Sequence, residues 1–191
     1  MPKPSLPNCT VVPDKLDLRD RPYMPAIAVK PAAGMHPRLK LPVLNQGESS
    51  ACTGFALASV VNYLLRTRTP RAPQVSPYMI YSMARRYDEF PGYTQDTGSS
   101  LRGAMKGWYK HGACRFDLWN QLEMPPAAQK AQDDWWWDAV QRPLGAYYRV
   151  DSRSVVDMQI ALNEVGILYA SAICHDTFHQ LGSRPVPSEG S

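Results

Sequence analysis

The sequence predicts an α+β protein, with helices in the first half of the chain and a sheet beginning in the second half. Three segments with a helical spacing of apolar residues occur before residue 112. Two segments that favour strands follow, at residues 146–150 and 167–173. The chain has 191 residues and 18 prolines, which indicate many loops and few long regular elements. We therefore expect one loop-rich domain, or two small subdomains packed over a shared cleft.

The first two expected helices have recognisable starts. The segment 51–66 is apolar on most of its circumference and should be buried, with Ser49 and Ser50 available as N-caps. A Ser-Pro pair precedes the second helix, at residues 78–87. Serine caps the first amides of a helix and proline is tolerated at its first position, so this pair is a strong start signal.

The third helix is expected after Ser99 or Ser100. It carries apolar residues at helical spacing and ends at the pair His111-Gly112, where the glycine can adopt a left-handed cap. Three helices thus occupy the first half of the chain.

The second half begins with a change of composition. Residues 124–143 are rich in proline, alanine and glutamine and contain three consecutive tryptophans, which suits an excursion or a short amphipathic turn. These tryptophans form either a hydrophobic plug or a contact surface. A strand at 146–150, a helix from Ser152 or Ser154 to residue 164, and a strand at 167–173 are then expected.

These patterns divide the chain into four parts. They are an extended N-terminal wrap, a helical subdomain, an insertion rich in Trp and Pro, and a partial β subdomain, at residues 1–44, 45–123, 124–143 and 144–191.

Composition and charge argue against several classes of protein. The net charge is +4 and the basic residues are dispersed, so nucleic-acid binding is not favoured. Neither a secretory signal nor an apolar run of membrane-spanning length is visible, so we expect a cytoplasmic protein without a membrane partner. The four cysteines, at 9, 52, 114 and 174, are widely spaced. We expect reduced thiols, no metal site and no cofactor.

Cys52 is the candidate nucleophile. It stands at the start of the first helix, where unpaired N–H groups and the helix dipole favour the thiolate over the thiol. Gln46 lies in the preceding loop, and its amide together with the N–H of Cys52 could form an oxyanion hole. Taken alone, Cys52 could equally be a small buried core residue.

The segment "VLNQGESSACTGFALA", residues 43–58, resembles the nucleophile region of papain-like cysteine peptidases. In that family Gln-Gly is followed by four residues and then by the cysteine that opens the central helix. The resemblance implies a helical half around that helix and an antiparallel, barrel-like C-terminal half. It also implies that Gly98 and Ser99 pair with an extended peptide or protein substrate, as an added strand does. The second family glycine is Ser99 here.

Two departures from the family pattern are informative. Secreted members have a disulfide between the positions that Ser49 and Asp96 occupy here. The family's general base, a histidine on a later strand, and its orienting asparagine have no counterpart before residue 191. Of the four histidines, His36 and His111 are expected in structural places, and His175 and His179 are weak candidates for the base.

The resemblance implies a thiol hydrolase of peptide bonds that lacks its base in this chain, so peptide hydrolysis should be very slow or absent. Three explanations stay open: the natural product extends further, a second chain completes the sheet, or the protein is a pseudo-enzyme. The alternative function is an inactive papain-like module that binds peptides or acts as a scaffold. An amidase or a transglutaminase-like enzyme is a third possibility.

Overall fold

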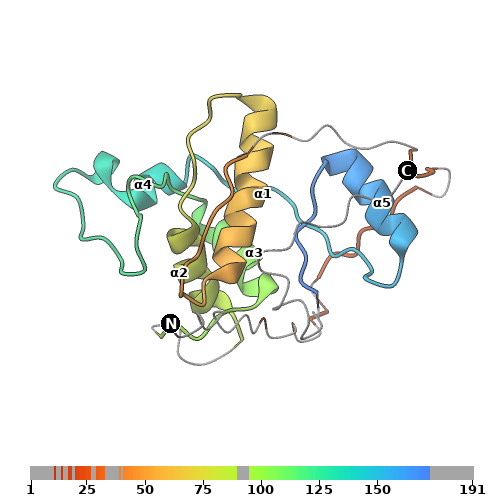
Figure 1. The fold of residues 1–191 in the computed structure, drawn as a ribbon, viewed down its shortest axis with the longest axis horizontal. Coiled ribbons are helices and arrows are strands. Elements are labelled where there is room, and N and C mark those ends of the chain that lie inside the picture. The colour runs from red at the N-terminus through yellow and green to blue at the C-terminus, as the bar shows by residue number, and fades with distance from the viewer. Residues whose placement is uncertain are drawn as a thin grey trace, which may run out of the picture.

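The computed structural model describes residues 11, 14, 17–18, 20–26, 29–32, 39, 41–89 and 95–172. Figure 1 shows three helices grouped in the centre, with a short helix on one side of them and a longer helix on the other. In chain order the elements are α1 (Cys52–Arg68), α2 (Pro77–Tyr87), α3 (Leu101–His111), the 3-10 helix η1 (Ala131–Asp133), α4 (Trp135–Ala139) and α5 (Val155–Val165). None of the helices in these ranges is long and apolar enough to cross a membrane.

The core lies between α1, α2 and α3. Leu57 and Val61 of α1 pack with Ile80 of α2 and Trp108 of α3, and all four side chains are buried. Full burial of one such aliphatic side chain contributes about 1.5–3 kcal/mol. The apolar circumference of α1 is therefore explained by its contacts with both neighbouring helices, as the sequence predicts.

Glycines allow these helices to approach closely. A Cβ atom placed on Gly54 of α1 would lie 2.6 Å from Cβ of Tyr81 in α2 and would overlap the carbonyl oxygen of Pro77. A Cβ on Gly103 of α3 would lie 2.7 Å from the carbonyl oxygen of Ala84 in α2. No other residue type fits at these contacts without displacement of a helix backbone.

Serine caps begin three of the helices. The hydroxyl of Ser76 accepts from the N–H of Met79 at 3.0 Å. Ser100 does the same for Gly103 in α3, and Ser154 for Asp157 in α5. The sequence-based starts of α2, α3 and α5 are thus confirmed.

Gly112 ends α3, but not in the expected left-handed helical conformation. Its φ is +76° and its ψ is −159°. The N–H of Ala113 donates to the carbonyl oxygen of Ala139 at 3.1 Å, so the chain turns out of α3 towards the end of α4. Glycine is still required, because φ is positive.

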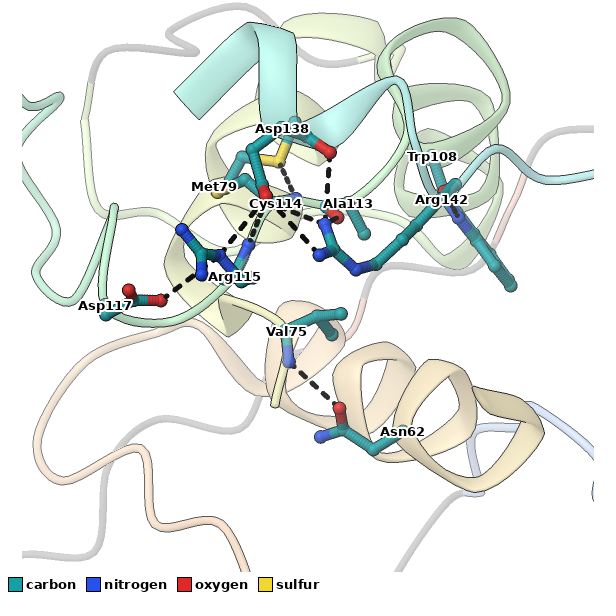
Figure 2. Close-up of polar contacts among 10 residues, drawn as sticks. All are labelled: Asn62, Val75, Met79, Trp108, Ala113, Cys114, Arg115, Asp117, Asp138 and Arg142. Atoms are coloured by element: carbon teal, nitrogen blue, oxygen red, sulfur yellow. Dashed lines mark hydrogen bonds and ion pairs between the residues drawn. The ribbon is translucent and has the colours of Figure 1, made fainter. Parts of the chain in front are cut away.

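The insertion at 124–143 is fixed to the helical core at its C-terminal end (Figure 2). The carboxylate of Asp138 accepts from the backbone N–H of Arg115 and from the guanidinium of Arg142, each at 2.7 Å. The indole N–H of Trp108 donates to the carbonyl oxygen of Arg142 at 3.0 Å. Asp138 therefore joins α4 to the segment that follows α3.

The three tryptophans of the insertion divide between core and surface. Trp135 packs edge-to-face on the buried Trp119, with ring centroids 4.9 Å apart. Trp136 and Trp137 contact each other and are 43% and 47% exposed.

Neither of the two expected strands is formed within the described residues. Residues 146–150 contain a single parallel bridge, between Arg149 and Pro22, and residues 167–172 contain no strand. Strands exist only as paired ladders, and within the described residues neither segment has a neighbour that pairs along its length. The barrel-like C-terminal half is therefore not seen in this part of the chain, while residues 173–191 lie outside the described ranges.

The N-terminal segment contacts the second half of the chain. The N–H of Tyr23 donates to the carbonyl oxygen of Arg149, and its hydroxyl donates to Glu164 of α5 at 2.7 Å. The side chain of Asp20 pairs with Arg102 of α3 and with Arg149.

Candidate functional site

Cys52 is the first residue of α1, and its side chain is partly exposed. The N-cap residue is Ala51, with no side chain bonded to the first amides. The expectation that Ser49 or Ser50 caps α1 is therefore wrong. Ser49 donates its hydroxyl to the carbonyl oxygen of Gln46 at 2.7 Å, within the preceding loop. The thiol thus stands at a helix start whose N-cap residue makes no side-chain cap, and a helix start favours an anion.

Gln46 uses its side-chain amide inside its own loop. Nε2 donates to the carbonyl oxygen of Ser49 at 2.7 Å. Asn45 accepts from the N–H of Gly47 at 2.9 Å, and Gly47 has a φ of +60°. An amide group carries two N–H donors, so one of them stabilises this tight loop beside Cys52. The structure brings the Gln46 loop to the start of α1.

Gly98 and Ser99 form a turn against the first turn of α1. Gly98 has a φ of +87° and donates its N–H to the hydroxyl of Tyr81 at 2.9 Å. The side chain of Ser99 is buried and shares a 2.5 Å hydrogen bond with the hydroxyl of Thr53, the residue after Cys52. The predicted substrate-binding turn and the predicted nucleophile therefore lie next to each other.

Tyr169 is a residue of this region that the sequence did not single out. Its hydroxyl donates to the carbonyl oxygen of Thr53 at 2.9 Å. Burial is the main cause that raises the pKa of Tyr169, and the Cys52 thiol raises it further. Tyr169 therefore stays protonated beside the nucleophile. It falls in an apolar segment taken as a strand, where no motif marked it.

Asp96 and Tyr81 also belong to the region. The carboxylate of Asp96 accepts from the N–H of Ser50 and from the hydroxyl of Tyr81. The sequence marked Asp96 only as a position where secreted papain-like peptidases have a cysteine. The structure shows instead that Asp96 makes a polar contact with the loop before Cys52.

His111 is the one histidine within the described residues; His36, His175 and His179 lie outside them. It ends α3, and its Nε2 atom is 2.7 Å from the hydroxyl of Tyr87. Burial and the nearby Arg86 lower the pKa of His111, so its charged form is disfavoured. At a rise of about 1.5 Å per residue, α3 separates His111 from the Ser99 turn by about 15 Å. His111 cannot reach Cys52.

Across the described ranges no three His, Cys, Asp or Glu side chains gather in a way that could hold a metal ion. Cys114 is fully buried and burial raises its pKa to about 12, so this thiol is structural.

Comparison with known proteins gives a match among solved structures. No protein-family model matches the sequence, and no curated protein matches it. Among solved structures, the crystal structure of xylellain, a cysteine protease from Xylella fastidiosa, matches with a TM-score of 0.60 at 26% sequence identity. This similarity supports a papain-like fold. The match covers 80% of this chain and 61% of the xylellain chain, so this chain spans less than two thirds of that protein's length.

Proposed function

We propose that the protein is a papain-like cysteine peptidase in which Cys52 is the nucleophile. The observation that carries the proposal is the place of Cys52. A partly exposed thiol opens the buried helix α1, beside the Gly98–Ser99 turn, in a fold similar to that of a cysteine protease.

The proposed reaction begins with the Cys52 thiolate, which attacks a peptide carbonyl carbon. The new C–S bond and the oxyanion form together, and the N–H of Cys52 would donate to that oxygen. Gln46 would add a second donor from the amide N–H that the loop does not use. The leaving nitrogen then takes up the proton that the Cys52 thiol gave up, the C–N bond breaks, and water hydrolyses the thioester. A group that carries this proton from the thiol to the amine is not among the described residues near Cys52.

A catalytically inactive peptide-binding module is the second candidate. It is favoured by one observation, which is that the described histidine, His111, lies at the far end of α3 from Cys52. Both candidates share the Gly98–Ser99 turn, so peptide binding alone does not separate them.

The test measures alkylation of Cys52 by a peptidyl epoxide and by iodoacetamide, followed by mass spectrometry of the labelled peptides. A nucleophile at a helix start should react about tenfold or more faster than N-acetylcysteine at pH 6–7, because more of it is thiolate. The buried Cys114 is the internal control and should stay unlabelled, and Cys52→Ser should abolish the fast phase. A Cys52 rate equal to that of N-acetylcysteine with both reagents would refute the activated nucleophile.

A further inference from the structure

We propose that Asp96 and Tyr81 are positioning residues that fix the loop before Cys52 to the turn at Gly98. The role in catalysis rests on the proposed function, because it requires a nucleophile on one side of the contact and a peptide-binding turn on the other. The contact itself is independent of that function and can be tested alone.

Ser50, Asp96, Tyr81 and Gly98 form a continuous chain of hydrogen bonds. Both carboxylate oxygens of Asp96 lie 3.1 Å from the backbone nitrogen of Ser50, two residues before Cys52. Oδ1 of Asp96 also accepts from the hydroxyl of Tyr81 at 2.7 Å. The oxygen of that hydroxyl accepts from the N–H of Gly98 at 2.9 Å. The path therefore runs from the nucleophile loop to the turn through two side chains, and we call it the Asp96–Tyr81 bridge.

The bridge has a rigid support. Tyr81 is fully buried and packs with Ala51 and Phe55 at the start of α1. The guanidinium of Arg85 lies 4.5 Å from the centre of the Tyr81 ring and donates to the carbonyl oxygen of Gln95 at 2.5 Å. Burial and the bond to Asp96 raise the pKa of Tyr81, so its hydroxyl remains a donor. The phenol is thus held by α2, while its oxygen reaches both loops.

Asp96 is the member that both loops depend on. Without its carboxylate the N–H of Ser50 loses its acceptor, and the Tyr81 hydroxyl loses the group to which it donates. A charged acceptor makes stronger hydrogen bonds than a neutral one. The Ser99–Thr53 hydrogen bond holds the same turn to α1 from the other side, so loss of Asp96 should loosen the turn without releasing it.

Amide hydrogen exchange, measured by NMR, tests the bridge. In Asp96→Ala the exchange of the Ser50 and Gly98 amides should both accelerate about tenfold or more. In Tyr81→Phe the Gly98 amide should accelerate, whereas the Ser50 amide keeps its carboxylate acceptor and should change much less. Unchanged exchange of Gly98 in Asp96→Ala would overturn the bridge, because the two loops would then be independent.

Chemical labelling tests the positioning role. The measured quantity is the rate constant of Cys52 with a peptidyl epoxide divided by its rate constant with iodoacetamide. Thiol ionisation and general access affect both rate constants, so their effects cancel in this ratio. Asp96→Ala should lower this ratio about tenfold, and Asp96→Asn, which keeps one acceptor oxygen, should give an intermediate value. Asp151→Asn is the matched control, since Asp151 pairs with Arg153 at the surface, and it should leave the ratio unchanged.

The outcomes separate the two proposals. Wild-type Cys52 rate constants equal to those of N-acetylcysteine with both reagents refute the proposed function and leave the bridge to the exchange experiment. A high wild-type ratio that Asp96→Ala retains refutes the positioning role, even if the variant melts at a lower temperature, because Asp96 would then act on stability alone.

Discussion

At the scale of single residues, Ser76 does more than cap a helix. Its hydroxyl oxygen accepts from the N–H of Met79 at the start of α2, and its proton is donated to the carbonyl oxygen of Trp119. The side chain is fully buried. Ser76 therefore links α2 to the segment that carries Trp119.

Ser76→Ala should lower the free energy of unfolding by about 2–4 kcal/mol, because loss of a cap costs about 1 kcal/mol and a buried unpaired carbonyl costs about 1–3 kcal/mol. Ser154→Ala is the matched control. Ser154 caps α5 at a partly exposed position, so its removal should cost about 1 kcal/mol or less. Urea denaturation of both variants checks the difference, and equal losses would show that the Trp119 contact contributes nothing.

The residues of the candidate site show which contacts a sequence motif can predict and which it cannot. The sequence marked Cys52, Gln46, Gly98 and Ser99 through one family pattern, and the structure places the two segments that carry them in contact. The sequence could not show that the side-chain amide of Gln46 donates to its own loop. That contact depends on the folded path of residues 45–50, which the spacing of letters does not describe.

At the scale of elements, the packing of α1 on α2 depends on Gly54. A Cβ atom there would overlap backbone of α2, at Pro77, rather than the end of a flexible side chain. The two helices cannot both keep their positions if a larger residue replaces Gly54. The close approach brings Tyr81 of α2 next to the first turn of α1.

Gly54→Ala should lower the free energy of unfolding by about 1–2 kcal/mol, because the cost of overpacking, about 1–3 kcal/mol, exceeds the gain of up to about 1 kcal/mol in helix propensity. Gly145→Ala is the control, since a Cβ at Gly145 meets nothing within 4 Å, and it should change stability by less than about 0.5 kcal/mol. Thermal unfolding of the two variants provides the comparison. An unchanged midpoint for Gly54→Ala would show that α1 and α2 can separate without cost.

The elements also show why helices were easier to predict than strands. The starts of α2, α3 and α5 are local, because a serine side chain bonds an amide three residues later. A strand depends on a partner that is remote in sequence. The segment 146–150 has the composition of a strand, yet it forms one bridge, to Pro22.

At the scale of the whole molecule, an ion-pair cluster joins three remote parts of the chain. Arg102 of α3 is buried and bonds Asp20, whose carboxylate also pairs with Arg149 at 3.1 Å. Arg102 bonds Glu89 as well, at 3.1 Å. The N-terminal segment, the helical core and residue 149 are thereby connected through one guanidinium and one carboxylate.

The cluster predicts how stability depends on pH. The hydrogen bond from Arg102 holds the pKa of Asp20 below its ordinary value of 3.8. The unfolded state therefore binds the proton first as pH falls, so the contribution of Asp20 is fully present well above pH 3.8 and is lost below it. Asp20→Asn should be less stable than the wild type by about 1.5–3 kcal/mol at pH 7, and the gap should narrow below pH 3.8.

Urea denaturation at pH 7, 5 and 3 measures this gap. Asp151→Asn serves as the control, because Arg153 also lowers the pKa of Asp151 but the pair is exposed to solvent, where ion pairs contribute little. A gap for Asp20→Asn that stays constant down to pH 3 would contradict the assignment of this effect to the Asp20 carboxylate.

The sequence by itself determined the helices of the first half and the place of Cys52 at the start of α1. Residues within about four positions of each other set the helix starts, the apolar circumference of α1 and the place of Cys52. Such short-range interactions can be predicted from the order of residues alone. The tertiary structure decided which residues distant in sequence come into contact. These contacts are the Asp96–Tyr81 bridge, the hydrogen bond of Tyr169 with Thr53, and the Asp20–Arg102 cluster. The members of these contacts are 15 to 116 residues apart, and only folding brings them within hydrogen-bond distance.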